Sequence, residues 1–556
     1  MEKKRSEFLS HEDWWSIWIG FAIILAGFAY FLMNPPDGMQ QDFDKYNAVL
    51  KEESKKPFKT IEWYQASELK GKIKGTNTES AKFLKQLTGK PKKWTMNPLE
   101  SILKFPAKIG MNYENIDSLK QLAGEYQTLA GAANFQDSIL NNRAQAAIYK
   151  WLAAKLEVDS QHKKLKEIKS SYNAIPYLMG LALFLGIIFA IGAQFMQGNG
   201  LKFFFGFFGV FALAVISYII AAQTDLKAAG LGYALWAILL GLIISNTVGT
   251  PKWMIPAIQT EFFIKTGLVL LGAEVLFGKI IQIGIPGLMV AWIVTPVVII
   301  VAFWFGKKYI KVKSDELNIT LCAATSVCGV SAAIATASAC KAKKEELTLA
   351  VGLSLIFTAI MMVLMPAFIE FVAMPEILGG AWMGGVIDST GAVAAAGAFL
   401  GEKALYVSAT IKMIQNILIG VVAFTVAIWW TMRKGAGGQR PNAMEIWYRF
   451  PKFVIGFVFA SIFASAISAY IGTDQSYALI DNGVISGFTK NLRGWMFCLA
   501  FVSIGLSTNF RELKSHFKGG KPFWLYIFGQ TFNLLLTLLI AWIAFYLIFP
   551  HITEAI

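Results

Sequence analysis

Long apolar segments constrain this chain more than any other feature of its sequence. One runs from Trp15 to Met33, and from Ile175 onward the chain is apolar almost to its C-terminus. Further full spans are expected near residues 175–197, 202–222, 230–248, 262–279, 285–306, 346–371, 405–431, 449–472, 488–510 and 522–549. Segments of roughly 18 apolar residues or more mark membrane-spanning helices. Because lipid offers the backbone no hydrogen-bond partners, the sequence predicts an all-α, polytopic membrane protein.

The distribution of charge agrees with a membrane protein. Charged residues make up 16% of the chain, below the roughly one quarter of soluble domains, and the net charge is +15. Basic residues gather at the N-terminus and in short loops at 307–315, 341–346, 432–452 and 511–521. Such loops face the cytoplasm and meet anionic lipid, which predicts a multi-pass protein of the bacterial inner membrane. No basic, aromatic-interleaved module indicates nucleic-acid binding.

Motifs for metal, cofactor or enzyme chemistry are missing from the sequence. The cysteines, Cys322, Cys328, Cys340 and Cys498, lie in apolar segments and form no C-x-x-C pair. The four histidines form no H-E-x-x-H pattern, and neither a Walker A sequence nor a dinucleotide fingerprint is present. We therefore expect no metal, no cofactor and no enzymatic activity.

Composition divides the chain into four parts. These are 1–33, a cytoplasmic N-terminus and first span; 34–172, a polar domain; 173–201, an extra span; and 202–556, a transporter core. The polar domain is Lys-rich and is expected to be helical and extracytoplasmic, since the N-terminus lies inside. Helices are predicted over 116–129 and 137–169, and a loop over 71–89. A cap or spacer and a docking or regulatory role are both compatible with this composition.

Two apolar segments, 316–341 and 378–400, differ from the predicted spans. They are rich in Gly, Ala, Ser and Thr, which permit close packing and helix breaks inside protein. They are either re-entrant hairpins or broken spanning helices. The basic loops favour hairpins, because only then do all of these loops fall on the cytoplasmic side.

A weak internal repeat supports this interpretation. Residues 272–279 resemble 505–512, and residues 325–333 resemble 387–395. Each of the second pair is followed by a short charged turn and one more helix. The elements occur in a different order in the two halves, so the repeats are expected to be inverted and permuted. Such symmetry, with an interrupted segment in each half, points to the binding site of a transporter.

The same segments carry a resemblance to a known family. G-L-V-L-L-G-A-E (267–274), T-S-V-C-G-V-S-A-A (325–333), K-A-K-K-E-E (341–346) and the small residues after Asp388 resemble the bacterial sulfate exporter family, inner-membrane proteins for which sulfate export is proposed. The order of elements is similar to the bile acid/sodium symporter superfamily, which implies inverted repeats with interrupted helices. The resemblance covers about residues 202 to 549.

The chain departs from the family pattern at three places. Family members often carry I-H-E-V-A-Q-V where residues 387–393 read I-D-S-T-G-A-V, and Arg where Glu274 stands and near Asn416. Lys412 is retained. Three potential cations are thus lost and two carboxylates gained, so the resemblance implies a transporter more strongly than it implies sulfate.

The two helix breaks supply the candidate site. Unpaired N–H groups and the positive end of a helix can hold an anion at mid-membrane depth. The predicted substrate-binding residues are Thr325, Ser326, Cys328, Gly329, Ser331, Ser389, Thr390, Gly391, Lys412 and Asn416. Packing of small residues is the alternative explanation of these clusters.

Ionisable residues within spans are further candidates, because their burial in lipid is costly. Asp388 and Glu274 are predicted to couple transport to a proton or a sodium ion. A structural pair between Asp388 and Lys412 is the alternative. Lys265 and Arg493 lie near the starts of their predicted spans and are expected to reach the interface.

Two functions remain open from the sequence. The first is a secondary transporter, an exporter or exchanger of a small anion such as sulfate, another sulfur-containing anion or a carboxylate. The second is a membrane-anchored receptor or regulatory module that acts through residues 34–172. A homodimer is expected by analogy with carriers built from inverted repeats. Substrate, direction and coupling ion are not specified by the sequence.

Overall fold

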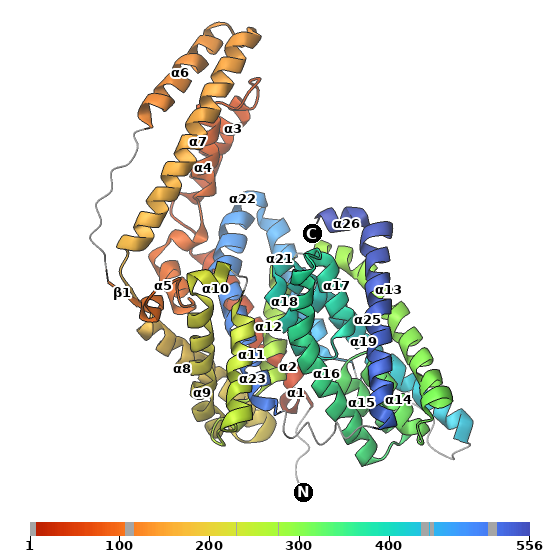
Figure 1. Cartoon of the computed structure of the whole chain (residues 1–556). Coiled ribbons are helices and arrows are strands. Elements are labelled where there is room, and N and C mark those ends of the chain that lie inside the picture. The colour runs from red at the N-terminus through yellow and green to blue at the C-terminus, as the bar shows by residue number, and fades with distance from the viewer. Residues whose placement is uncertain are drawn as a thin grey trace.

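A bundle of membrane-spanning helices forms the body of the molecule. The computed structural model describes residues 7–105, 116–228, 231–275, 277–434, 444, 447, 450–509 and 520–555. Within these ranges, nine helices are long and apolar enough to cross a membrane. They stand side by side, with the N-terminus at one end of the bundle and the C-terminus near the other (Figure 1). The predicted all-α, polytopic class is confirmed.

The helices follow the predicted apolar segments closely. The spanning helices are α2 (Glu12–Met33), α8 (Ile175–Gln197), α9 (Gly200–Ala221), α12 (Thr260–Glu274), α13 (Phe277–Phe305), α16 (Lys344–Phe371), α19 (Glu402–Lys434), α21 (Lys452–Ile471) and α25 (Lys521–Trp542). Turn η3 (Ile255–Ala257) leads into α12, and π-helical segments η4 (Gly306–Ile310) and η7 (Ile543–Ile548) extend α13 and α25. Short helices α1 (Glu7–Ser10), α10 (Thr224–Ala228), α22 (Thr473–Gln475) and α26 (Pro550–Ala555) lie at the ends of the bundle.

Two of the expected spans are built differently. The segment near 230–248 contains α11 (Tyr233–Thr247), which is only 15 residues long. The segment near 488–510 contains α23 (Lys490–Ser507), which continues directly from a π-helical segment, η5 (Ser476–Thr489). Helix α23 is buried over most of its length, whereas α11 is buried on one face, at Ala234, Ala237, Ile238, Gly241 and Ser245.

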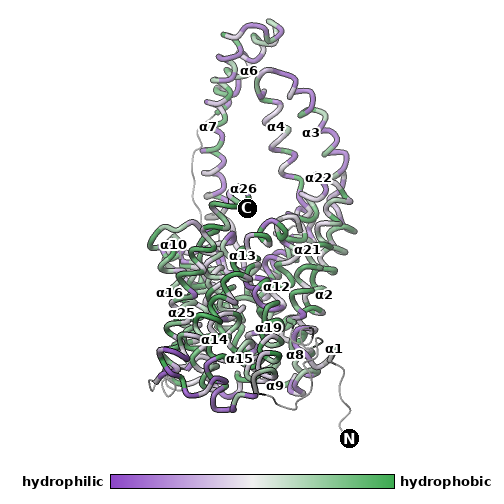
Figure 2. Tube along the Cα trace, turned by 90° about the vertical axis from the view of Figure 1, so that its right-hand side faces the viewer, coloured by the Kyte–Doolittle hydropathy of each residue, from purple (hydrophilic) through white to green (hydrophobic). Residues whose placement is uncertain are grey.

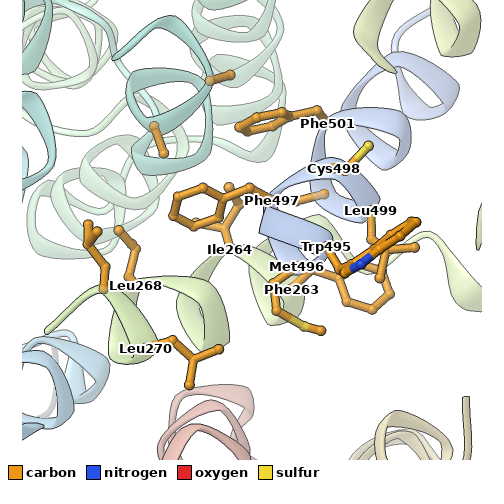
Figure 3. Close-up of a cluster of buried hydrophobic side chains, with 14 of the residues drawn as sticks. Phe263, Ile264, Leu268, Leu270, Trp495, Met496, Phe497, Cys498, Leu499 and Phe501 are labelled. Atoms are coloured by element: carbon orange, nitrogen blue, oxygen red, sulfur yellow. The ribbon is translucent and has the colours of Figure 1, made fainter. Parts of the chain in front are cut away.

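The core of one half of the bundle is formed by α12 and α23. Side chains of Phe263, Ile264 and Leu268 from α12 lie beside Phe497 and its neighbours from α23 (Figure 3). Close packing also joins α11 to α23 through glycines, because a Cβ at Gly241 would lie 2.7 Å from the Cα of Gly505. Small residues at such crossings allow the helix backbones to approach.

The two segments rich in small residues each form a pair of short helices. The first pair is α14 (Asp315–Ala324) and α15 (Gly329–Cys340); the second is α17 (Glu376–Val386) and α18 (Thr390–Leu400). The Cys340 sulfur lies 3.9 Å from the Glu316 carbonyl oxygen, and a Cβ at Gly401 would lie 2.7 Å from a carboxylate oxygen of Glu376. The outer ends of each pair therefore meet, so each pair is a helical hairpin.

The hairpins occupy different ends of the bundle. Figure 1 shows α14 and α15 at the end that holds the N-terminus, and α17 and α18 toward the other end. Their tips, Thr325–Cys328 and Ile387–Ser389, point into the interior. The hairpins thereby bring two helix breaks to the middle of the bundle.

The polar N-terminal domain projects beyond the bundle at the end away from the N-terminus (Figure 1), and its hydrophilic colouring contrasts with the apolar helices (Figure 2). It contains α3 (Met39–Glu53), α4 (Ile61–Gly71), η1 (Gly75–Asn77), α5 (Glu79–Leu87), η2 (Pro98–Ser101), α6 (Asp117–Ala132) and α7 (Ser138–Lys169). Strands β1 (Leu103–Lys104) and β2 (Tyr172–Asn173) pair antiparallel beside the bundle.

The predictions for this domain were right for two helices and wrong for one segment. Helices α6 and α7 match 116–129 and 137–169. The segment 71–89 was predicted as a loop, yet it contains α5. The Thr78 hydroxyl accepts a hydrogen bond from the Ala81 N–H at 3.3 Å, an N-cap that starts this helix.

Candidate functional site

The tips of the two hairpins touch each other in the middle of the bundle. Gly329 begins α15, and a Cβ at this position would lie 3.1 Å from the Asp388 carbonyl oxygen and 2.0 Å from the Ser354 hydroxyl oxygen. Glycine favours this approach, since a methyl group here would displace the Ser354 hydroxyl and press against the backbone of the second hairpin. The close contact fixes the two breaks relative to each other.

A central cavity of about 360 Å³ begins at these tips. Hairpin residues lining it are Cys328, Val330, Ser331, Asp388, Ser389 and Thr390; the other lining residues are His11, Glu12, Asp13, Glu261, Lys265, Ser354, Leu355, Thr358, Asn416, Ile419, Phe450, Pro451 and Phe453. The cavity extends to the first turn of α2, at the end of the bundle where the N-terminus lies. It therefore connects the hairpin tips with one end of the bundle.

Two helix N-termini meet at this cavity. Helix α15 starts after Cys328 and α18 starts after Ser389, and neither of these side chains caps its helix. The first backbone bonds within the helices run from Ala332 N–H to Cys328 and from Val393 N–H to Ser389. The N–H groups before Ala332 and Val393 have no partner in their own helices and carry the positive ends of the helix dipoles.

The carbonyl groups at the breaks are covered by amide side chains instead. Gln415 of α19 donates to the carbonyls of Ser326 and Gly385 at 2.9 and 3.0 Å. On α25, Asn533 donates to the Thr325 carbonyl at 2.8 Å, and Gln530 donates to the Val386 carbonyl at 3.2 Å. The acceptors of the broken helices are thus satisfied by protein, whereas their donors are left near the cavity.

The two amides of α25 were missed by the sequence analysis. Gln530 and Asn533 stand three residues apart in an apolar span, so they lie on one face of α25. Polar residues at such depth are costly unless they have partners, and this was the signal that could have identified them.

Asp388 lies at the tip of the second hairpin and is almost fully buried, with 2% of its surface exposed. Its carboxylate accepts a hydrogen bond from the Tyr526 hydroxyl of α25 at 2.6 Å. Lys412 does not pair with it; the Lys412 ammonium donates to the Val327 carbonyl and to the Gln415 side chain at 2.5 and 2.7 Å. The structural Asp388–Lys412 ion pair considered from the sequence is absent from the described residues.

The predicted substrate-binding residues divide into two sets. The cavity is lined by Cys328, Ser331, Ser389, Thr390 and Asn416, together with Asp388. Asn416 also donates to the Thr390 hydroxyl at 2.9 Å, which joins α19 to the second hairpin.

The other predicted residues lie behind the cavity wall. The hydroxyls of Thr325 and Ser326 donate to the Cys322 carbonyl at 3.0 and 2.6 Å, so they are used within the first hairpin. Gly329 forms the tip contact, Lys412 is buried, and a Cβ at Gly391 would face Ile264 at 3.5 Å. These residues support the wall of the central cavity but do not line the cavity itself.

Glu274 does not lie at the central cavity. Its carboxylate pairs with Arg493 of α23 at 2.8 Å, and the two side chains are 1% and 6% exposed. The expectation that Arg493 reaches the interface was wrong, because η5 continues into α23 and places Arg493 well inside a longer helical run. The pair joins α12 to α23 within the bundle.

Lys265 lies at the mouth of the central cavity. Its ammonium pairs with Glu12, with Asp13 at 2.8 Å and with Glu261 at 3.8 Å. Asp13 also accepts a hydrogen bond from the Lys452 N–H at 2.7 Å, which ties α2 to α21. Lys265 is therefore fixed among carboxylates at the start of α12, where the sequence had predicted a side chain directed to the interface.

Comparisons with known proteins agree with this architecture. A family model described as "Conserved hypothetical protein 698" matches residues 205–525. A UPF0324 membrane protein of Nitratidesulfovibrio vulgaris is 51% identical over 568 residues, which cover 100% of this chain and 98% of the relative. A UPF0324 membrane protein of Rhodopirellula baltica is 55% identical over 387 residues, 69% of this chain and 70% of the relative.

A more distant relative, a UPF0324 inner membrane protein of Escherichia coli, is 24% identical over 328 residues, 56% of this chain and 88% of the relative. No solved structure matches the chain. With its apolar spans and these relatives, the chain is a multi-pass protein of the bacterial inner membrane. It belongs to the UPF0324 family of membrane proteins, to which the matched family model and the relatives point together.

Proposed function

We propose that this chain is a secondary transporter that carries a small anion across the inner membrane together with a proton or a sodium ion. The observation that carries the proposal is the meeting of the two hairpin tips at the central cavity. An anchor has no need of two helix breaks that touch each other. Transporters use such breaks because they place backbone groups at mid-membrane depth.

The donors left at the breaks suit an anion. The N-termini of α15 and α18 offer unpaired N–H groups and positive dipole ends, and the hydroxyls of Ser331, Ser389 and Thr390 line the same cavity. The amides of α19 and α25 cover the carbonyl groups that would repel an anion. The polarity of the tips therefore favours a negatively charged solute.

Because carboxyl side chains outnumber lysines in the cavity lining, an anion should enter together with a cation. Among the described lining residues there are four carboxyl side chains, Glu12, Asp13, Glu261 and Asp388, but one lysine, Lys265. An anion entering this field is repelled unless protons or metal cations compensate the carboxylates. Asp388, at the hairpin tip, is the group we propose for coupling. Glu274 is not, since Arg493 already compensates its charge.

The arrangement of the hairpins supports alternating access. We assign the N-terminal end of the bundle to the cytoplasm, as the basic loops indicate, and the N-terminal domain to the opposite side. The first hairpin then enters from the cytoplasm and the second from outside, as inverted and permuted repeats require. The resemblance to the sulfate exporter family supports an anion as the solute.

Solute counterflow in proteoliposomes tests the transporter. Vesicles loaded with sulfate, thiosulfate, sulfite or a small carboxylate should accumulate the same labelled anion through the protein. Glu370→Gln changes an exposed residue of α16 outside the cavity lining, and this variant should show the same counterflow as the wild type. Counterflow of none of these anions would contradict the proposed solute class.

Labelling of Cys328 tests the site directly. Cys328 lines the cavity and is partly exposed, whereas Cys322, Cys340 and Cys498 are buried. A transported anion should slow the reaction of N-ethylmaleimide with Cys328, and Cys328→Ser should abolish the fast labelling. An anion that is transported without protecting Cys328 would place the site elsewhere.

A further inference from the structure

A second cavity, of about 620 Å³, lies where the N-terminal domain meets the bundle. It is bounded by α5, by the loop that follows α5, and by the segment that leads from β2 into α8. We call it the lysine cavity, because its charged lining residues are Lys82, Lys85, Lys90 and Lys92. No described Asp or Glu lines it.

The lysines differ in how far their charge is compensated. Lys82 pairs with Glu79 at 2.6 Å, and Glu79 lies outside the lining. Within the described residues no ion pair joins Lys85 or Lys90 to a carboxylate. Lys92 lies 3.5 Å from the centre of the Tyr172 ring. The described lining of the cavity is therefore basic, since it holds four lysines and no carboxyl side chain.

Lys90 occupies the most constrained position of the four. Its ammonium lies 5.3 and 5.8 Å from the ring centres of Tyr218 and Tyr233, and a Cβ at Gly494 would touch it. Burial, and after it the charge of Arg493, lower the pKa of Lys90 to about 8. Tyr218, Tyr233 and Gly494 do not line the lysine cavity, so the ammonium of Lys90 is held against the bundle and the cavity is left with Lys82, Lys85 and Lys92 to meet an anion.

The fold holds the loop that carries Lys90 in place. The Thr88 carbonyl accepts a hydrogen bond from the Trp495 indole at 3.1 Å, and Trp495 itself is buried against Phe211, with ring centres 5.0 Å apart. The loop is therefore docked on α23, and the lysine cavity is set by contacts between two parts of the chain. A site fixed in this way needs little ordering on binding.

We propose that the lysine cavity binds a phosphate- or sulfate-type oxyanion group, as a second site separate from the central cavity. Two sources share this chemistry. One is a free inorganic anion outside the membrane, and the other is the headgroup of an anionic lipid, since Tyr177 and Leu178 of the first turn of α8 line the cavity at the end of the span. This inference does not depend on the proposed transport activity.

Binding of inorganic phosphate to the full-length protein in a neutral detergent tests the free-anion source. Lys82→Gln/Lys85→Gln removes two charges at positions that are solvent-exposed, and Lys120→Gln/Lys150→Gln removes two exposed charges elsewhere in the same domain. The first double variant should bind labelled phosphate about tenfold more weakly, and the second should bind like the wild type.

Nanodiscs distinguish the lipid source. The protein is placed in discs of phosphatidylcholine with and without phosphatidylglycerol, and the retained lipid is measured by native mass spectrometry. The wild type and Lys120→Gln/Lys150→Gln should retain phosphatidylglycerol. Lys82→Gln/Lys85→Gln should retain less. A difference in either assay supports the site and identifies its source. No difference between the two double variants in both assays overturns the proposal, because a general charge effect would then explain any binding.

Discussion

The Tyr526 hydroxyl donates a hydrogen bond to the Asp388 carboxylate, with 2.6 Å between the two oxygens. The two residues lie 138 positions apart and belong to α25 and to the tip of the second hairpin. Through Gly329, the same tip contacts the first hairpin. Asp388 is thus the residue at which the hairpins, a spanning helix and the central cavity come together.

Asp388→Asn separates exchange from coupling. The amide keeps nearly the same shape and can still meet Tyr526, but it cannot take up a proton or bind sodium as a carboxylate does. We expect anion exchange to persist and its dependence on a proton or sodium gradient to disappear. Tyr526→Phe keeps the carboxylate and should keep gradient dependence. Transport by Asp388→Asn that responds to the gradient like the wild type would make Asp388 structural.

Gly329→Ala should disrupt the contact between the hairpin tips. The added methyl group would lie 2.0 Å from the Ser354 hydroxyl oxygen and 3.1 Å from the Asp388 carbonyl, so we expect a loss of about 1–3 kcal/mol in stability, as for other overpacked sites. Thermal denaturation in detergent measures it.

The control for this prediction is a second glycine at the other break. At Gly391 the nearest atom to a new methyl would be 3.5 Å away, and the residue is helical, so Gly391→Ala should be neutral or stabilising by up to about 1 kcal/mol. Adding Ser354→Gly to Gly329→Ala should recover part of the loss. Equal effects of the two single changes would argue against a specific tip contact.

The sequence predicted the bundle well because apolar length and the small-residue pattern are local properties. It predicted both interrupted segments, because runs of Gly, Ala, Ser and Thr mark helix breaks whichever helices they pack against. It could not find the partner of Arg493, which is 219 residues away, and it misjudged the depth of Arg493 because η5 lengthens the helix before α23. The position of Gln530 and Asn533 in an apolar span marks them as candidates, but the carbonyl groups that they contact depend on tertiary structure and could not be predicted.

The N-terminal domain should lose stability in acid through Glu68. Its carboxylate pairs with Lys72 at 2.6 Å and with Lys155 of α7. Hydrogen bonds from Lys155 and Lys72 hold the pKa of Glu68 below its usual range. A carboxyl group whose pKa is lower in the folded state stabilises the fold above its unfolded pKa, and this contribution is lost as the pH falls through the folded value.

Glu68→Gln should therefore lower the melting temperature at about pH 6 and have a smaller effect at about pH 4. The control is Glu157→Gln, an exposed change on α7, which should alter neither value. If the melting temperatures of wild type and Glu68→Gln differed by the same amount at both pH values, the charge of Glu68 would not be what stabilises its contacts with Lys72 and Lys155.

Two ion pairs of equal length differ sharply in burial. Glu274–Arg493 and Glu402–Lys490 both have 2.8 Å between nitrogen and oxygen, but the side chains are 1% and 6% exposed in the first and 53% and 39% exposed in the second. Removing one partner of a buried pair leaves an uncompensated charge in the bundle, whereas the exposed partner of a broken surface pair is hydrated.

Glu274→Gln and Arg493→Gln should each destabilise the protein by about 3–5 kcal/mol, while Glu402→Gln and Lys490→Gln should each cost about 0–1 kcal/mol. The double variant Glu274→Gln/Arg493→Gln should be more stable than either single variant, because neither charge is then buried alone. Thermal denaturation of all variants in one detergent gives the comparison. If the double variant lost the sum of the two single effects, the pair would not be coupled and Glu274 could again be considered a separate coupling group.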